Sequence, residues 1–439
     1  MSNPNEDRTV NTEQYNRRLM GNVVRLPFVV DAAHGSALHV REPKPRTLLD
    51  FWGDEGVCSL GYNSPEYRNA LARFGRTGQP HQLPDVYPNE VRWDAAEIIC
   101  DRTGMDRIFF CNSGTEANEA MIKLARKYWW DREGRPMEGN HYAATANRHV
   151  ILTLAGNFHG RTGLSQAASD PRVSPYHRWG FGPPAPGFGV LIGTPTGFSQ
   201  VVVDGRSVSR EPNWETVAAI NLAPVLGNNC VRTYPREFWA NLLAVRDQHG
   251  VLLMYDDVQA GSGRAGYHST WQHPGVQIKP DILALGKGMA MGFPMAAMLA
   301  REEIAQAFTP GVHFNTFGGS PFVCAMAHYF YGWLDRNLPE VRRKGEAIRS
   351  ALAAEPWIDS HDGAGLLNAF TPYYRRWGYD GFQFCHEARS FGLSIVTHRR
   401  FGPIRFTPPL NVSDGEIEIA LDALRRTHAR LATEEGPAT

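Results

Sequence analysis

The chain has 439 residues, of which 42% are hydrophobic and 21% are charged, a composition typical of a soluble globular protein. Its 45 basic and 45 acidic side chains cancel at pH 7, and no block of like charge stands out. We therefore expect neither a nucleic-acid partner nor an anionic membrane surface as a partner. A chain of this length needs more than one core, so two or three substructures around one site are expected.

We expect no secretory signal, because residues 1–14 are polar and lack the apolar stretch of a secretory leader. The longest uncharged apolar run, Gly288 to Ala300, is too short to span a membrane. Six scattered cysteines show neither a CxxC pair nor a zinc-type spacing. The sequence thus predicts a cytoplasmic protein with no metal site and no disulfide framework.

Strand and helix signals alternate along the chain in the order that builds a mostly parallel sheet. After a polar arm of twenty residues, short apolar runs over 23–51 predict small strands. A strand at 108–111 is expected to lead into a helix at 116–132. Further strands are predicted at 150–154, 217–222, 251–255, 282–285 and 295–299, and a helix at 236–249. The Pro/Gly-rich stretch between 180 and 214 predicts a long loop.

Helices resume near Pro321, and strands are predicted at 365–370, 393–397 and 404–407. A capping box, Ser413 to Glu416, predicts the start of a last helix. We expect an α/β fold with a large domain over 56–320. A smaller α+β domain would combine residues 321–439 with part of the N-terminal segment 1–55.

Four short segments at the ends of predicted strands carry side chains that could hold one cofactor. Ser113, Gly114 and Thr115 lie between a strand and a helix, where free N–H groups and the helix dipole can bind a phosphate. An ordinary helix cap is the alternative. Asp256 follows a buried strand, where a carboxylate needs a cationic partner such as a protonated pyridine nitrogen. Helix capping is again the alternative.

Lys287 lies between two glycines at the end of the next predicted strand. Partial desolvation there would lower its pKa and make its amine a nucleophile toward an aldehyde, whereas a solvated surface charge is the alternative. The fourth segment, 156–162, carries Phe158, which could stack on an aromatic ring, and Arg161, which could bind a carboxylate. Ordinary packing and a surface ion pair are their alternatives.

These segments together resemble the signatures of class III, fold-type-I aminotransferases such as the acetylornithine, ornithine and 4-aminobutyrate enzymes. The resemblance is carried by SGTEANEAMIKLAR, FHGRT, DDVQAGSGRAG, KPDILALGKGMAMGFP and FGGSPFVCAMA, and it extends over nearly the whole chain. It implies the fold-type-I architecture, pyridoxal 5′-phosphate as cofactor, and transamination between an amino donor and an oxo acid.

The resemblance also implies roles for individual residues. The implied cofactor-binding set is Ser113, Gly114, Thr115, Phe158, His159, Asp256, Gln259, Lys287 and Thr316. Lys287 matches the Schiff-base lysine, which also moves the proton between Cα and the cofactor. Asp256 matches the partner of the pyridine nitrogen, and Gln259 matches the partner of the ring hydroxyl. Thr316 matches a threonine that reaches the phosphate across a subunit interface, which implies a homodimer with shared sites.

Two arginines match substrate contacts, and the sequence between them departs from the family pattern. Arg405, in GPIRFTPP, matches the arginine that binds the substrate α-carboxylate, and Arg161 matches a second carboxylate-binding arginine. Relatives usually carry EPVQGEGG, but here Ala223 and Asn228 replace both glutamates. In several relatives the second glutamate masks the C-terminal arginine. Because Asn228 cannot do so, we expect Arg405 to be permanently available. Asp257 also replaces a usual glutamate, which puts the substrate in doubt.

Transamination through Lys287 is the leading hypothesis. One alternative keeps the cofactor but breaks a different Cα bond, as in a decarboxylase or a racemase. Another is a catalytically silent protein that retains the cofactor. Assays for oxo acid, carbon dioxide and loss of optical rotation separate these reactions, and the identities of donor and acceptor stay open at this point.

Overall fold

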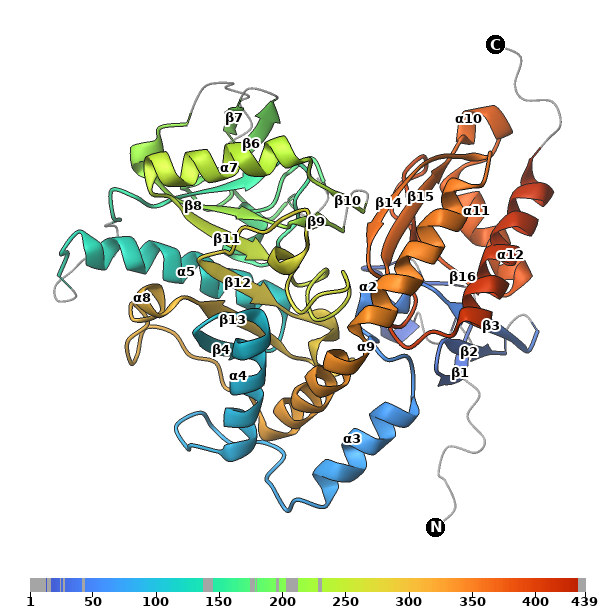
Figure 1. Cartoon of the computed structure of the whole chain (residues 1–439), viewed down its shortest axis with the longest axis horizontal. Coiled ribbons are helices and arrows are strands. Elements are labelled where there is room, and N and C mark those ends of the chain that lie inside the picture. The colour runs from blue at the N-terminus through green and yellow to red at the C-terminus, as the bar shows by residue number, and fades with distance from the viewer. Residues whose placement is uncertain are drawn as a thin grey trace.

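The structure is a computed structural model of the chain. It describes residues 13, 17–23, 25–26, 28–41, 44–136, 145–173, 178, 180–194, 197–202, 212–227 and 231–432. Two lobes lie side by side, and the long helix α9 (Pro321–Ala353) passes from one to the other (Figure 1). Within the described ranges, no helix combines the length and apolar character that crossing a bilayer requires.

An eight-stranded sheet forms the centre of the larger lobe. In spatial order its strands are β4 (Arg107–Cys111), β13 (Ala296–Ala300), β12 (Ile282–Leu285), β11 (Leu252–Asp256), β8 (Val217–Leu222), β5 (Val150–Leu154), β6 (Phe188–Thr194) and β7 (Gly197–Val202). Strand β11 pairs in parallel with β12 and β8, whereas β13 and β7 run antiparallel to their neighbours. The predicted mostly parallel α/β sheet is thereby confirmed.

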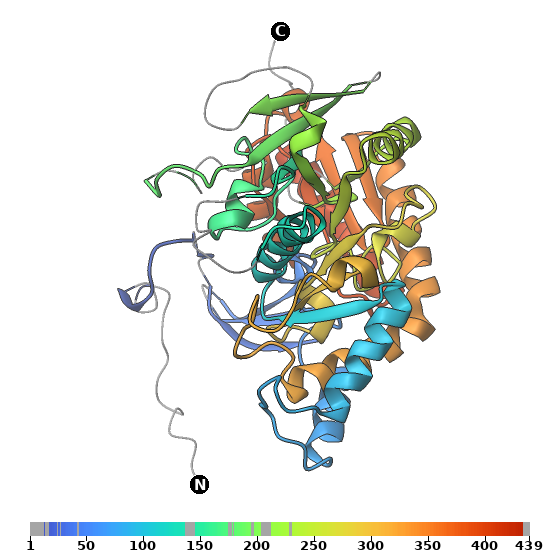
Figure 2. The same ribbon diagram turned by 90° about the vertical axis from the view of Figure 1, so that its left-hand side faces the viewer.

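Helices cover both faces of this sheet, which explains why its inner strands are continuous apolar runs. The helices of the lobe are α3 (Pro65–Gly75), α4 (Glu90–Thr103), α5 (Gly114–Arg132), α6 (Gly163–Ala167), α7 (Arg236–His249) and α8 (Glu302–Ala305), with 3₁₀ turns η2 (Trp214–Thr216), η3 (Thr270–Gln272) and η4 (Lys287–Ala290). Successive residues of β12 point to opposite faces. Ile282 belongs to the hydrophobic cluster that includes α5, whereas Leu283 belongs to the cluster that includes α4 and α9. The turned view shows the helices on the two sides of the sheet (Figure 2).

The smaller lobe contains two four-stranded sheets. One is β1 (Val30–His34), β2 (Ala37–Val40), β3 (Arg46–Asp50) and β16 (Leu393–Ser394), and the other is β14 (Ile358–Ala364), β15 (Leu367–Pro372), β18 (Ile404–Phe406) and β17 (Val396–Thr397). The remaining elements are α2 (Gly53–Gly56), β9 (Val225–Leu226), β10 (Arg232–Thr233), α10 (Tyr374–Trp377), α11 (Gly381–Ala388), η5 (Arg389–Phe391) and α12 (Asp414–Leu431). Because β3 pairs with β16, segments from both chain ends share one sheet. The division at residues 55 and 320 stays a prediction.

Two predicted segments differ from the structure. The stretch from 180 to 214 is not one loop, because β6 and β7 form a hairpin within it and β6 extends the sheet beside β5. The predicted strand 393–397 is divided at Ile395, since β16 pairs with β3 and β17 pairs with β18 in the other sheet. In both cases the deciding contact is a pairing with a strand distant in sequence.

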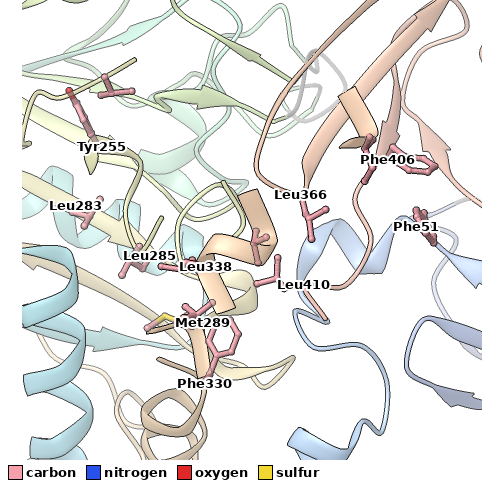
Figure 3. Close-up of a cluster of buried hydrophobic side chains, with 14 of the residues drawn as sticks. Phe51, Tyr255, Leu283, Leu285, Met289, Phe330, Leu338, Leu366, Phe406 and Leu410 are labelled. Atoms are coloured by element: carbon pink, nitrogen blue, oxygen red, sulfur yellow. The ribbon is translucent and has the colours of Figure 1, made fainter. Parts of the chain in front are cut away.

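A single hydrophobic cluster joins the lobes (Figure 3). Its members include Tyr255, Leu283, Leu285, Met289, Phe330 and Leu338 from the larger lobe and α9, together with Phe51, Leu366, Phe406 and Leu410. The rings of Phe51 and Phe406 lie 4.6 Å apart, and Thr407 N donates to Phe51 O at 2.7 Å. This packing places the segments next to Phe51 and Phe406 beside the carboxyl ends of β11 and β12.

Candidate active site

The carboxyl ends of two adjacent parallel strands carry Asp256 and Lys287. Asp256 ends β11 and pairs in register with Ala284 of β12, and Lys287 begins η4 shortly after β12. In open α/β sheets, ligands bind at this edge. The backbone of Lys287 is in the left-handed region, with φ 48°. Non-glycine residues rarely adopt this conformation, and those that do are often found in functional sites.

The amine of Lys287 has an altered acidity. Burial lowers its pKa to about 8, the carboxylates of Glu55 and Asp256 oppose that change, and the guanidinium of Arg405 adds to it. A lysine with such a pKa is partly neutral near physiological pH and can act as a nucleophile. Asp256 and Lys287 lie at the carboxyl ends of neighbouring parallel strands, which places both at the same edge of the sheet.

Asp256 is held in place by neighbouring polar side chains. Its Oδ2 accepts from Asn118 Nδ2 at 2.9 Å and from His159 Nδ1 at 2.7 Å, while Val258 N donates to Oδ1 at 3.1 Å. His159 Nε2 lies 2.9 Å from Thr153 Oγ1, so both ring nitrogens of this buried histidine have protein partners. His159 therefore orients Asp256, and its predicted link to a cofactor runs through that carboxylate.

The start of α5 has the features of an anion site. Ser113 is the N-cap, and the first N–H groups of a helix have no partner within it. Thr115 Oγ1 lies 2.6 Å from Ser165 Oγ. A Cβ added at Gly114 would lie 2.5 Å from Val258 Cγ1, so only glycine lets the helix start so close to the end of β11.

The loop after β5 carries the predicted aromatic residue and the second predicted arginine. The guanidinium carbon of Arg161 lies 4.9 Å from the centroid of the half-buried Phe158 ring. Asn157 fixes the loop, because its Oδ1 accepts from Ala223 N at 2.6 Å and its Nδ2 donates to Tyr234 at 3.0 Å. Ala223, which stands where relatives have a glutamate, thus supports the loop through its backbone.

Glu55, which the sequence reasoning missed, lies at the centre of the charged groups. Its carboxylate forms an ion pair with Arg405, lies 2.9 Å from His398 Nε2 and lies 3.9 Å from Lys287 Nζ. Gln259 Nε2 donates to it at 3.2 Å. Burial opposes ionisation of Glu55, but the hydrogen bond from His398 and the charges of Arg405 and Lys287 hold its pKa well below the usual range.

The expectation that Arg405 is permanently available was therefore wrong. Its guanidinium is 4% exposed and already carries the carboxylate of Glu55. Asn228, on which that expectation depended, lies outside the described residues. The only sequence signal for Glu55 is an acidic pair between two glycines in the segment GDEG, which lies far from every motif used above.

Asp257 does not face the charged groups. Its carboxylate accepts from Ser269 Oγ and Thr270 N, both at 2.7 Å. Complete burial raises the pKa of Asp257 to about 6. Its side chain thus supports the start of η3, which corrects the inference that its shortness bears on the substrate.

The remaining predicted residue, Thr316, is exposed, and its main-chain oxygen accepts from Gln82 Nε2 at 3.0 Å.

Taken together, the site offers a helix start for a phosphate, a carboxylate at the end of β11 and an amine of lowered pKa. Such a donor set fits pyridoxal phosphate, which carries a phosphate, a basic ring nitrogen and an aldehyde. Within the described ranges, no cluster of three His, Cys, Asp or Glu side chains is arranged to hold a metal ion.

Comparison with known proteins gives one consistent result. The family model described as aminotransferase class-III matches residues 20–427. An acetylornithine aminotransferase of Thermosynechococcus vestitus is 33% identical, over 96% of this chain and 97% of its own. A succinylornithine transaminase of Salmonella enteritidis is 31% identical, over 97% and 98%. The crystal structure of an ornithine aminotransferase from Toxoplasma gondii superposes with a TM-score of 0.80 at 24% identity, over 96% of this chain and 95% of that one.

Proposed function

The chain belongs to the class-III aminotransferases and is a pyridoxal-phosphate-dependent transaminase, and from this premise we propose that Lys287 holds the cofactor covalently while Arg405 receives the substrate carboxylate. The alternatives of a decarboxylase, a racemase or a silent protein are set aside, because the family and the relatives named above are aminotransferases. When bound, the cofactor supplies an electron sink for negative charge at the substrate Cα.

The observation that carries this proposal is the placement of Lys287 and Asp256 at the ends of adjacent parallel strands. With a pKa of about 8, the Lys287 amine is available both to attack an aldehyde and, once released, to take a proton from Cα. Asp256, oriented by Asn118 and His159, provides the negative charge that a cationic ring nitrogen needs. Ser113, Gly114 and Thr115 would hold the phosphate.

For the substrates, we propose an amino acid with a terminal primary amine as donor and a 2-oxo acid as acceptor. The relatives named for acetylornithine and succinylornithine support an acylated ornithine as the donor. Both types of substrate carry a carboxylate that suits the guanidinium of Arg405. Arg161, which is exposed beside Phe158, would serve a second carboxylate.

A half-reaction screen tests this assignment. Holoenzyme is mixed separately with N-acetylornithine, ornithine, 4-aminobutyrate and alanine, and a donor is identified by loss of the absorption of the aldehyde form of the cofactor. Addition of 2-oxoglutarate should restore that absorption. We expect the acylated ornithine to react fastest, and we expect no turnover from Lys287→Ala.

The variant Arg405→Ala tests whether this arginine binds the substrate carboxylate, independently of the amino-group transfer at Lys287. The variant should raise the KM for 2-oxoglutarate by about 10- to 100-fold, because a charge-assisted hydrogen-bond pair is lost. Normal turnover by Lys287→Ala would refute the cofactor assignment. An unchanged KM for Arg405→Ala would show that the substrate carboxylate binds elsewhere.

We also propose a homodimer in which Thr316 of one subunit reaches the phosphate site of the other. Large apolar side chains are exposed on the segment of Thr316, namely Phe314 (59%) and Phe317 (64%), and on the segment that follows its contact Gln82, namely Val86 (73%), Tyr87 (59%) and Trp93 (67%). Trp93 and Phe314 line one pocket with Phe110 and Asn315. Exposed apolar side chains in such number are typical of a surface that a partner covers.

A cytoplasmic location completes the proposal. The five cysteines in the described part of the chain are free, which is typical of proteins in a reducing compartment. Fractionation of cells with an antibody against the chain would test it, because recovery from an oxidising compartment would contradict the proposal.

A further inference from the structure

The carboxylate that Arg405 binds in this structure belongs to the chain itself. We infer that Glu55 is a specificity-determining residue, which occupies Arg405 as an internal carboxylate and yields that position to a carboxylate substrate. The inference rests on the proposed role of Arg405 in substrate binding. The family motifs assign no role to Glu55.

The contacts show why the two carboxylates must compete. Arg405 is 4% exposed, whereas the side chain of Glu55 is 26% exposed. Solvent and ligands therefore reach the Glu55 carboxylate more easily than they reach the guanidinium with which it pairs. His398 Nε2, 2.9 Å from the other carboxylate oxygen, also holds Glu55 in this position. An incoming carboxylate forms a full pair with Arg405 only after Glu55 has moved.

The backbone that carries Glu55 is suited to such a movement. The turn α2 consists of four consecutive residues in the left-handed region, with φ 59° at Gly53, 49° at Asp54, 60° at Glu55 and 85° at Gly56. Asp54 and Glu55 are strained there, because their Cβ atoms crowd the backbone. A displacement that returned these two residues to ordinary backbone angles would release this strain, which would offset part of the loss of the ion pair.

The residues on both sides of the turn are fixed, which confines the movement to the turn. Asp50 accepts from Trp52 N at 3.0 Å, from Gly53 N at 3.2 Å and from Tyr62 Oη at 2.7 Å. On the other side, Ser59 Oγ donates to Gly288 O at 2.9 Å. The two glycines of the turn can absorb a change of backbone angles between these anchors.

This arrangement has a direct consequence for substrate choice. A substrate end without a carboxylate leaves the pair between Glu55 and Arg405 intact, whereas a carboxylate has to displace Glu55 before it gains the guanidinium. The apparent affinity for carboxylates is therefore reduced by the fraction of enzyme in which Glu55 occupies Arg405. Removal of the Glu55 charge should raise that affinity.

Calorimetric titration of the holoenzyme with valerate tests the inference. Valerate is a five-carbon carboxylate without an amino or oxo group, so it binds without reaction. We expect Glu55→Gln and Glu55→Ala to bind valerate about tenfold more tightly than the wild type. Arg405→Ala should lose measurable binding. Glu340→Gln is the matched control, because Glu340 also pairs with an arginine, Arg343 at 2.9 Å, but on an exposed helix face.

Thermal melting of each variant shows that it is folded, and Glu55→Gln retains the size of the side chain if Glu55→Ala is unstable. Equal or weaker valerate binding by folded Glu55→Gln would overturn the inference. If that result accompanies normal turnover of N-acetylornithine, the proposed function stands and only the role of Glu55 is lost. If no donor reacts with the wild type, the proposed function fails, whatever the valerate affinities are.

Discussion

Charge balance around Lys287 determines when its amine can react. Burial and Arg405 favour the neutral amine, whereas Glu55 and Asp256 favour the ammonium form. The resulting pKa of about 8 is a compromise between groups from three separate segments. At the residue scale, the reactivity of this lysine is therefore a property of its neighbours, and one of them, Glu55, can be altered without a change in the lysine.

Glu55→Gln should move the pH dependence of cofactor capture. In the wild-type apoenzyme, the rate of reaction with pyridoxal phosphate should rise with pH through about 8, as Lys287 loses its proton. Loss of the Glu55 charge removes a group that raises this pKa, so the midpoint should shift to lower pH. Stopped-flow absorbance over a pH series measures the shift. An unchanged or higher midpoint, relative to Glu340→Gln, would contradict the prediction.

At the scale of elements, the site depends on how closely α5 approaches the end of β11. The N-terminus of α5 packs against Val258, two residues after Asp256, and Gly114 leaves no space for a side chain at this contact. The buried face of α5, which includes Ala117, Met121 and Leu124, fixes the helix across the sheet. Its first turn therefore cannot move far to relieve a clash.

Gly114→Ala should weaken cofactor binding through this contact. The added Cβ would lie 2.5 Å from Val258 Cγ1, and such overpacking typically destabilises a structure by about 1–3 kcal/mol. A small displacement of the helix start that relieves the clash would move its N–H groups away from the proposed phosphate position, so we expect the affinity for pyridoxal phosphate to fall by up to roughly 150-fold. Equilibrium titration of the apoenzyme, followed by absorbance, measures it.

A second substitution provides the control. Val258→Ala removes both Cγ atoms, so the double variant Gly114→Ala with Val258→Ala should regain most of the lost affinity. If the double variant binds the cofactor no better than Gly114→Ala alone, the steric explanation is wrong.

At the scale of the whole molecule, the site depends on the packing of the two lobes and, in the proposed homodimer, on the second subunit. The shared cluster of buried side chains holds the lobes together (Figure 3), so that Arg405 from β18 meets residues at the ends of β11 and β12. The exposed side chains of Trp93 and Phe314, which line one pocket, offer a surface for the proposed second subunit. The first feature lies within one chain, whereas the second requires two.

Phe314→Glu should therefore impair both assembly and activity. Phe314 is 59% exposed in the single chain, and a charge buried at an interface without a partner is strongly unfavourable. Analytical ultracentrifugation should show monomer at micromolar concentration, with reduced cofactor affinity because Thr316 of the second subunit is missing. Phe382→Glu is the control, since Phe382 is 51% exposed on α11 of the smaller lobe. A dimer of unchanged stability would refute the proposed interface.

Much of the fold could be predicted because its signals are local. Apolar runs such as 217–222 and 282–285 match β8 and β12 at both ends, and the capping box at Ser413 marks the start of α12. The hairpin of β6 and β7 could not be predicted in this way, because Pro and Gly surround it and its pairing with β5 stabilises it.

The same distinction applies to the site. Asp256 and Lys287 each follow a buried apolar run, and parallel strands bring their carboxyl ends to one edge, so the sequence alone determined this pair. The partner of Arg405 was decided only by the tertiary structure, because Glu55 lies 350 residues away along the chain. An ion pair between such distant residues leaves no periodicity or spacing in the sequence, since it depends on how the two lobes pack against each other.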